Sequence, residues 1–419
     1  MAKAKRTDYL ASTSVLTKQN LRKGESYNEK TELFYTYYYD ETGKRKKLTS
    51  KTLEGLREKK NNVDNLLAND VKASAKDRTL DSVYAEWLKR KSGLVQHTRA
   101  NYEWVYEHYC LGHKLGKMKV QDITKGTIRD HYNKLRDQRG LAITTIDGLQ
   151  TVVNQVLSYA VDERYIRANP AVGAMTEMKR SRKLNQAHPA LTKEEQDRFL
   201  SFIENHETFS HWYPLFKVFL GTGMRCGELT GLRWSDINLS DGTIDINHTL
   251  LYYSSKEAGG CRFQVGKPKT KAGYRTVVMI KGVKEAFEQQ RQYLNDNKIR
   301  CNALIEGTSD VPEEFYTDFV FLNKDGSCFH QGTINKAITR ICHLANVEAM
   351  DKGLTMLPPF SSHTFRSTYI TRSAEKGVPI DVTMKQVGHM NRSVTEQIYT
   401  TVSPSWQKRE LAAMQDLFE

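Results

Sequence analysis

The chain has 419 residues, and its 63 Lys and Arg against 49 Asp and Glu give a formal net charge of +14 at neutral pH. This length exceeds what one hydrophobic core usually organises, so we expect two or three domains. The positive surplus favours a polyanionic partner, although charge alone fits an unspecialised basic protein equally well. Composition therefore excludes a single small domain and leaves the function open.

No apolar run approaches the roughly 20 residues that a membrane-spanning helix needs, and the start, MAKAKRTDYL, lacks the apolar core of a secretory signal. The six cysteines are scattered without paired spacing, which is typical of free thiols in a reducing compartment. Two Cys–His pairs occur, Cys328 with His330 and Cys342 with His343. Neither spacing matches a familiar zinc finger. We therefore expect an intracellular protein without membrane segment, metal or cofactor.

Residues 1–70 have the pattern of a small sheet followed by a helix. The segment 33–39 is dense in the aromatic and β-branched residues that strands prefer. Residues 40–43 have the composition of a turn, and 44–47 open a returning strand. An apolar stripe predicts a helix over 51–68. The expected module is a three-stranded sheet that carries one helix.

Tyrosines and basic residues are interleaved along these strands. This pattern favours contact with DNA over the alternative, a stabilising cap with a solvated charged rim. Because side chains of a strand alternate between its two faces, only part of the set can share one face. The candidate contacts are Tyr35, Tyr37, Tyr39, Lys44, Arg45 and Lys47.

A polar, weakly patterned segment at 71–78 is interpreted as a linker, and a second domain of short helices is expected over 78–172. Thr79 has the character of a helix cap, and apolar residues recur beyond it at helical spacing. The pair Asn169–Pro170 ends the block, because the residue before proline leaves helical geometry. The helices are predicted over 79–88, 98–110, 124–137 and 143–161.

The segment 176–189 is predicted to be an exposed linker, with an ordinary loop as the alternative. Its basic run is expected to lie against DNA phosphates. The candidate contacts within it are Lys179, Arg180, Arg182 and Lys183.

The last domain, 188–419, is expected to mix helices with short strands. Thr192 followed by Glu195 has the spacing of a capping box, which predicts a helix start. A final amphipathic helix is predicted over 406–418. The strands are predicted over 243–246, 249–253 and 274–280. The fold class is thus a multidomain, mainly α chain with small β-sheets and a mixed α/β last domain.

Four short motifs follow one another in this last domain. Arg225 comes after a glycine turn and before a helix, where backbone amides favour an anion. A His-x-x-Arg motif joins His363 to Arg366, a Gly-His pair ends at His389, and Tyr399 follows shortly after. Taken singly, Arg225, His363 and Arg366 are more often surface or ion-paired residues, His389 could simply cap a helix, and Tyr399 is one of 21 tyrosines. In this order and spacing they resemble the boxes of tyrosine recombinases, and the layout of the whole chain resembles integrases of phages and conjugative transposons.

The resemblance implies that Tyr399 is the nucleophile and becomes bonded to a DNA phosphate. It also implies that Arg225 and Arg366 clamp the scissile phosphate, and that His363 and His389 hold it and assist proton movement. The implied activity is site-specific recombination, in which DNA is cut and rejoined through a 3′-phosphotyrosine to integrate or excise a mobile element. The alternatives are a relaxing enzyme like type IB topoisomerases and a DNA-binding regulator that has lost the reaction.

The family's lysine is expected in a β-hairpin, and the stretch 266–275 matches that position. Lys269 is our choice for this residue, with Lys267 and Lys271 as close rivals. Glu228 matches the family's common acid after the first arginine. We expect it to orient that arginine and not to react.

Elementary chemistry favours arginine and tyrosine for such a reaction. A phosphodiester under attack gathers charge on its nonbridging oxygens, and guanidinium offers paired donors to them. Two nearby arginines favour the ionised form of a tyrosine, whose ordinary pKa is about 10. A lysine can protonate the leaving oxygen, and the aryl phosphate conserves the bond energy. We therefore expect no metal or ATP, and the chain has no Gly-x-x-x-x-Gly-Lys-Ser/Thr loop.

The resemblance also implies partners. Double-stranded DNA would be bound at arm sites by 1–70 and at core sites by the other two domains, and a homotetramer would act on two DNA partners. The helix over 406–418 would dock on a neighbouring protomer or, alternatively, pack on its own domain. An accessory DNA-bending or excision factor is a further expected partner. The expected location is the nucleoid in the cytoplasm of a bacterium.

Overall fold

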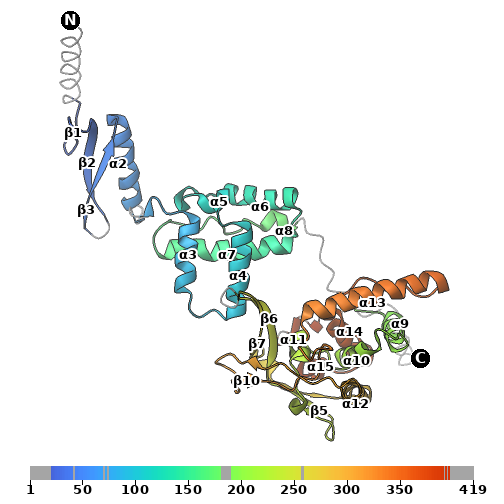
Figure 1. Ribbon diagram of the computed structural model, residues 1–419. Helices are drawn as coiled ribbons and strands as arrows, with labels where there is room; N and C mark the ends of the chain where they lie inside the picture. The colour runs from blue at the N-terminus through green and yellow to red at the C-terminus, as the bar shows by residue number, and fades with distance from the viewer. Residues whose placement is uncertain are drawn as a thin grey trace, which may run out of the picture. The chain divides into compact units, whose positions relative to one another are not determined.

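A computed structural model of the chain describes residues 20–40, 43–68, 71–72, 75–180, 190–255, 259–390, 392–393 and 395–396. Its internal contacts form two compact units, Met1–Lys183 and Leu184–Glu419, and each unit is described by itself (Figure 1). None of the helices in these ranges is both long enough and apolar enough to cross a membrane. Arg182, Lys183, Tyr399 and the helix predicted over 406–418 lie outside the described residues.

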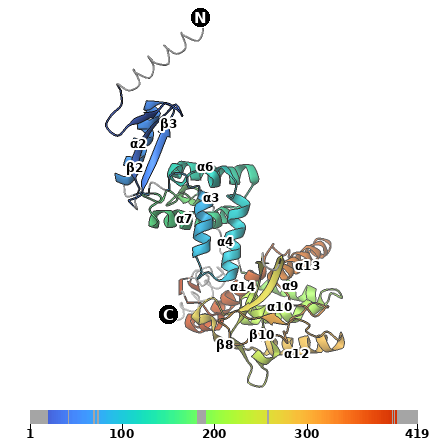
Figure 2. The same cartoon turned by 60° about the vertical axis from the view of Figure 1, so that its left-hand side comes forward.

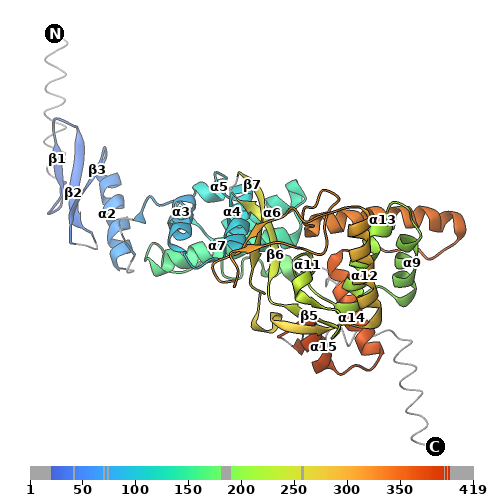
Figure 3. The same cartoon turned by 60° about the horizontal axis from the view of Figure 1, so that its bottom comes forward.

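The described part of the first unit begins with a three-stranded antiparallel sheet in the order β1 (Ser26–Asn28), β2 (Leu33–Tyr39) and β3 (Arg45–Ser50). Helix α2 (Leu53–Ala68) packs against β2 and β3 (Figures 1 and 3). The strand predicted over 33–39 is confirmed. The predicted helix begins two residues late, because the Thr52 hydroxyl accepts a hydrogen bond from the Gly55 N–H (3.1 Å) and so caps it.

The helical part of the first unit contains the four helices that the sequence predicts, with small shifts at their ends. Thr79 caps α3 and Thr124 caps α6, each by accepting a backbone hydrogen bond three residues on. Their apolar faces meet in one core, in which Leu149 and Val156 are fully buried. The elements are α3 (Leu80–Arg90), α4 (Gln96–Tyr109), α5 (Lys114–Lys117), η2 (Val120–Asp122), α6 (Lys125–Arg139), α7 (Ile143–Asp162) and α8 (Thr176–Arg180).

Both segments interpreted as linkers are in part packed structure. Ala75 is fully buried in the helical core, although it lies in the stretch 71–78. Residues 176–180 form α8, and Met175 and Met178 insert into the same core one helical turn apart. The linker interpretation is therefore wrong for 176–180, because two methionines at helical spacing outweigh the basic residues that follow them. The predicted domain range 78–172 stays a prediction.

The described residues of the second unit form helices and three small sheets (Figures 1 and 2). Its helices are α9 (Lys193–Glu204), η3 (Ser210–Trp212), α10 (Tyr213–Thr222), α11 (Cys226–Thr230), η4 (Trp234–Asp236), η5 (Lys271–Gly273), α12 (Lys281–Asp296), α13 (Gln331–Lys352), α14 (Ser362–Glu375) and α15 (Ile380–Val387). Its strands are β4 (Ile237–Asn238), β5 (Thr243–Ile246), β6 (Thr249–Ser255), β7 (Gly260–Gly266), β8 (Arg275–Val278), β9 (Ile305–Glu306) and β10 (Phe315–Tyr316). The expected fold class, mainly α with small sheets, is confirmed.

The strands of this unit differ from the prediction at one functionally relevant place. The predicted strands 243–246 and 249–253 are confirmed in β5 and β6, and 274–280 shortens to β8. Strand β7 is not predicted, because its exposed half is polar and glycines stand at both of its ends. β7 pairs with β6, whereas β8 joins a sheet in the order β4-β5-β8. The lysine-bearing stretch 266–275 therefore connects two sheets, and the expectation of a hairpin there is wrong.

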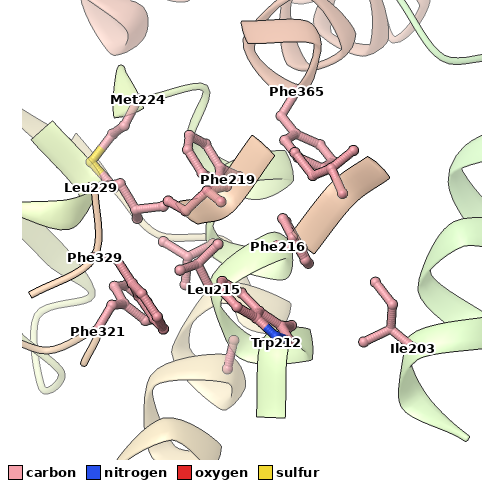
Figure 4. Close-up of a cluster of buried hydrophobic side chains, with 14 of the residues drawn as sticks. Ile203, Trp212, Leu215, Phe216, Phe219, Met224, Leu229, Phe321, Phe329 and Phe365 are labelled. Atoms are coloured by element: carbon pink, nitrogen blue, oxygen red, sulfur yellow. The ribbon is translucent and has the colours of Figure 1, made fainter. Parts of the chain in front are cut away.

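An aromatic core lies beneath the motif-bearing helices of the second unit (Figure 4). Phe365 of α14 is fully buried, and its ring lies 5.2 Å from that of Phe216 and 5.4 Å from that of Phe219, both on α10. Because Phe365 immediately precedes Arg366, its packing fixes the face of α14 from which the arginine projects. The capping box predicted from Thr192 to Glu195 is confirmed at the start of α9.

Replacing Phe365 with alanine should lower the local free energy of unfolding of α14 by about 3–5 kcal/mol, because it leaves a cavity in a close-packed core. Hydrogen exchange of the α14 amides in the full chain measures this loss. Phe365→Leu keeps most of the volume and should lose clearly less. Equal exchange in wild type and Phe365→Ala would contradict the assignment of Phe365 to this core.

Candidate active site

Arg225 stands at the junction of two helices. Helix α10 ends at Gly223 with a φ of +61°, and a Cβ there would lie 2.6 Å from the Tyr369 ring, so only glycine fits. Arg225 is the N-cap of α11, as the sequence predicts. Glu228 holds it at two points, accepting hydrogen bonds from the Arg225 N–H (2.9 Å) and from Nη1 (2.8 Å). The expectation that Glu228 orients Arg225 agrees with this geometry.

A second glycine brings the Gly-His motif against Arg225. Gly388 is the C-cap of α15 with a φ of +70°, and its carbonyl oxygen accepts a hydrogen bond from Arg225 Nη2 (2.9 Å). A Cβ on Gly388 would lie 2.7 Å from the carbonyl oxygen of Ala272. The end of α15 therefore touches both Arg225 and the turn that follows Lys271.

Arg366 is almost completely buried, at 3% exposure. Its Nη1 donates to the Gly223 carbonyl oxygen (2.8 Å), and its Nε donates to His389 Nε2 (3.2 Å). Its Nη2 is buried and has no hydrogen-bond partner among the described residues. Burial and the neighbouring Arg225 lower the pKa of Arg366 to about 9, so the group stays cationic at neutral pH. A buried cation with one open donor is suited to an anionic ligand.

His389 is fixed as a neutral ring. Its Nε2 accepts from Arg366, so the proton is on Nδ1, which donates to Thr395 Oγ1 (2.8 Å). Burial, together with the charges of Arg366 and Arg225, lowers the pKa of His389 to about 3. His363 contributes to the same lowering from the exposed first turn of α14. The structure thus groups His389, Arg366 and Arg225, with His363 near them.

Arg275, which the sequence patterns did not reveal, completes this cluster. Arg275 donates to Glu228 through Nη2 (2.8 Å) and Nη1 (3.2 Å), and its side chain is only 6% exposed. Burial raises the pKa of Glu228, but the hydrogen bond and charge of Arg275 and the charge of Arg225 hold it below its usual value. The signal for Arg275 in the sequence was indirect. If Glu228 is buried, its carboxylate needs positively charged partners, and Arg275 is one of them.

The candidate lysines flank this cluster on the 266–275 connection. Lys267 forms an ion pair with Asp310 (2.8 Å). Lys269 and Lys271 are exposed, and neither forms an ion pair with another described residue. The turn after Lys271 is anchored where the Gly273 carbonyl accepts from the arginine at 275 (3.0 Å). The choice of Lys269 stays a prediction.

The candidate DNA contacts of the first unit fall into two groups. On the sheet, the Arg45 guanidinium lies 3.7 Å from the centre of the Tyr37 ring, and Lys47 Nζ lies 4.1 Å from that of Tyr35. Strand alternation places Tyr39, 64% exposed, on the same face, opposite the buried side of β2.

The remaining candidates of the first unit lie elsewhere. Lys44 is an exposed turn residue next to β3. On α8, Arg180 is exposed and Lys179 pairs with Asp147 (2.7 Å). Among the described residues of the whole chain, no three His, Cys, Asp or Glu side chains gather as a metal ion requires.

Comparison with known proteins identifies relatives of this chain. Residues 189–405, just over half of the chain, match the model of the Phage integrase family. A Tyrosine recombinase XerC-like protein of Caldanaerobacter subterraneus subsp. tengcongensis is 27% identical over 388 residues, which cover 90% of this chain and 94% of the relative. The Tn1549 transposon integrase in complex with a circular intermediate DNA is similar in structure, with a TM-score of 0.66 and 21% identity over 80% of this chain and 99% of that one. A lambda integrase tetramer bound to a Holliday junction has a TM-score of 0.52 and 18% identity over 90% and 95% of the two chains.

The chain therefore belongs to the phage integrase family. Members of this family are tyrosine recombinases, enzymes that cleave and rejoin DNA. The structural likenesses show that the fold is shared with the transposon and lambda integrases. The expected family, fold class and activity are confirmed.

The ring of His389 should not titrate between pH 5 and pH 8 in the free protein, because its pKa is lowered to about 3. NMR of selectively labelled histidine, with the signal assigned by His389→Gln, measures this. In the unfolded chain the same ring should titrate near its ordinary value of about 6.5. Since only the unfolded state binds this proton between the two values, His389 should make folding less favourable as the pH falls below 6.5. A midpoint near 6.5 in the folded chain would contradict the buried neutral ring.

Proposed function

We propose that this chain integrates and excises a mobile DNA element with Tyr399 as the nucleophile and with Arg225 and Arg366 on the scissile phosphate. The observation that carries the proposal is the open Nη2 donor of Arg366, buried beside Arg225 and without a partner among the described residues. A phosphate oxygen supplies the acceptor and the negative charge that this donor needs.

The charge of the cluster supports a phosphate ligand. The described core of the site holds the guanidinium groups of Arg225, Arg275 and Arg366 against one carboxylate, Glu228. Three guanidinium groups against one carboxylate leave the cluster with a surplus of positive charge, to which the neutral His389 ring adds none. Such preorganised donors act on charge that develops as a phosphodiester is attacked.

The chemistry needs a nucleophile and an acid besides this clamp. We assign attack on phosphorus to the ionised Tyr399 oxygen, whose proton has been lost to solvent, with expulsion of the 5′-oxygen of the next nucleotide. Lys269 would donate the proton that this leaving oxygen takes up, and Lys267 or Lys271 is the alternative donor. His363 and His389 would hold the phosphate, His389 through Arg366, because its neutral ring accepts a hydrogen bond from that arginine. Rejoining reverses these steps, with the 5′-hydroxyl as the attacking group.

The other parts of the chain would hold the DNA. We assign arm-site binding to 1–70 and core-site binding to 78–172, which would close on duplex together with the catalytic domain, 188–419. The basic residues of α8 and of the segment after it, Lys179, Arg180, Arg182 and Lys183, would lie against phosphates. The tetrameric lambda integrase on a Holliday junction supports a tetramer of this chain on two DNA partners. In that assembly the segment 406–418 would dock on a neighbour, and an accessory bending or excision factor would complete the complex on the bacterial nucleoid.

Tyr399→Phe should abolish the covalent protein–DNA adduct and leave DNA affinity nearly unchanged, because the phenol oxygen is the group that bonds to phosphorus. A duplex from the end of the element, nicked beside the cut site, traps the adduct for gel analysis. Persistent cleavage by Tyr399→Phe would show that another residue is the nucleophile. With wild type, strand exchange between two duplexes, and not mere relaxation of one plasmid, separates recombination from topoisomerase activity.

The double variant Arg45→Ala/Lys47→Ala should weaken binding of arm DNA and lower the slope of log K against log salt by about 2, because two phosphate contacts are lost. Cleavage of core DNA should be unchanged. The matched control is Lys59→Ala/Lys60→Ala on α2, which removes the same charge from the helix that covers the other side of the sheet. Equal losses in the two variants would indicate general charge attraction and not a specific sheet surface.

A further inference from the structure

Arg275 occupies all of its donor nitrogens within the protein. Its Nε donates to the Gln386 carbonyl oxygen (2.8 Å), its Nη1 donates to the Gly273 carbonyl (3.0 Å) and to Glu228, and its Nη2 donates to Glu228. Four of its five N–H groups are thus engaged within the protein, and only 6% of its side chain is exposed, so little of it is available to a phosphate. In this it differs from Arg366, whose Nη2 is open among the described residues.

These contacts connect three segments that carry different parts of the chemistry. Glu228 belongs to α11 and holds Arg225, Gln386 lies in the last turn of α15 just before Gly388 and His389, and Gly273 ends the turn that follows the candidate lysines. Glu228 and the Gly388 carbonyl would still hold Arg225 if the side chain at 275 were absent.

The lysine turn depends more directly on this side chain. The side-chain hydrogen bond that joins the turn to the rest of the cluster among the described residues is the one from Arg275 to the Gly273 carbonyl. The turn also touches Gly388, since the Ala272 carbonyl oxygen leaves no room for a Cβ there. Loss of the arginine would therefore release the turn first and the phosphate clamp second.

We propose that Arg275 is a positioning residue that sets the place of the lysine-bearing connection 266–275, and thereby of the acid that protonates the leaving oxygen. The proposal rests on the proposed function, because it assumes a lysine of this connection as the acid. It assigns Arg275 no contact with DNA.

A substrate with a sulfur leaving atom tests this role. A 5′-bridging phosphorothiolate at the cut site departs as a thiolate, which needs little help from an acid because thiols are far more acidic than alcohols. A defect in the acid is therefore restored on this substrate, whereas a defect in the phosphate clamp is not. Single-turnover adduct formation by the full chain is compared on the phosphorothiolate and on the ordinary phosphodiester.

Arg275→Met should slow cleavage of the phosphodiester by about 100-fold, the scale of general acid catalysis, and should regain most of that loss on the phosphorothiolate. Lys269→Ala, run beside Lys267→Ala and Lys271→Ala, identifies the acid as the lysine variant that is restored in the same way. Arg366→Lys should stay slow on both substrates, because it acts on the nonbridging oxygens.

A matched control separates positioning from general loss of a buried arginine. Arg198 on α9 also bonds a carboxylate, that of Glu348, and a backbone carbonyl, that of Ala345, and none of these belongs to the site. Arg198→Met should therefore leave the ratio of the two cleavage rates at the wild-type value.

Gln386→Ala keeps the test decisive if Arg275→Met folds poorly. The Gln386 side chain forms hydrogen bonds with the backbone N–H and carbonyl of Val278 in β8, at the surface. Its removal therefore loosens the contact between α15 and the strand that carries Arg275, without leaving a buried charge unpaired. We expect a smaller loss, again restored on the phosphorothiolate.

The possible results are distinguishable. An equal loss on both substrates for Arg275→Met and Gln386→Ala overturns the positioning role while wild-type cleavage upholds the proposed function. Absence of any adduct with wild type on either substrate overturns the proposed function and this inference with it.

Discussion

One buried carboxylate determines whether the catalytic cluster can exist. Glu228, with 2% of its side chain exposed, accepts hydrogen bonds from Arg225 and from Arg275. Without it, three neighbouring guanidinium groups, of which those of Arg275 and Arg366 are buried, would repel one another with little solvent to screen them. With it, two of the three are fixed in direction, and the cluster as a whole stays positive. The same carboxylate caps α11, so the start of that helix and the aim of Arg225 are determined together.

Backbone carbonyls at helix ends supply the rest of the support. The carbonyl of Gly223 ends α10 and accepts from Arg366, and that of Gly388 ends α15 and accepts from Arg225. The C-terminus of a helix carries partial negative charge, so a cation is stabilised there. Both residues have positive φ, which glycine adopts without strain. The glycines of the motifs are thus explained by close approach of these helix ends to the arginines.

The sequence predicted the parts of the site that are local, and missed those that depend on distant contacts. The place of Arg225 at a helix start follows from the glycine turn before it, Glu228 follows from the resemblance to the first box, and the structure shows both at the start of α11. Arg275 was missed because its partner lies 47 positions away and its strand was recognised only as β-branched. Strand β7 and helix α8 were missed for a related reason. Polar or basic residues dominate both segments, so the few side chains that pack give only a weak apolar pattern. Contacts between residues close in sequence can be predicted from local patterns, whereas burial depends on contacts made throughout the fold.

Without DNA, the described part of the site contains an unpaired donor and neighbouring positive charges, and a bound phosphate would make both more favourable. Arg366 is a buried cation whose pKa is lowered to about 9 by burial and by Arg225, and one of its donors is open within the described residues. His389 is neutral because burial disfavours its charged form and because its protonation would add a further positive charge beside Arg366 and Arg225. A phosphate oxygen would satisfy the open donor and offset the repulsion among the arginines at once, so part of the free energy of DNA binding is available at the reacting phosphorus. Because the charge on that phosphate grows as the bond breaks, the same contacts strengthen toward the transition state, and this difference is what makes a phosphate-binding cluster a catalytic one.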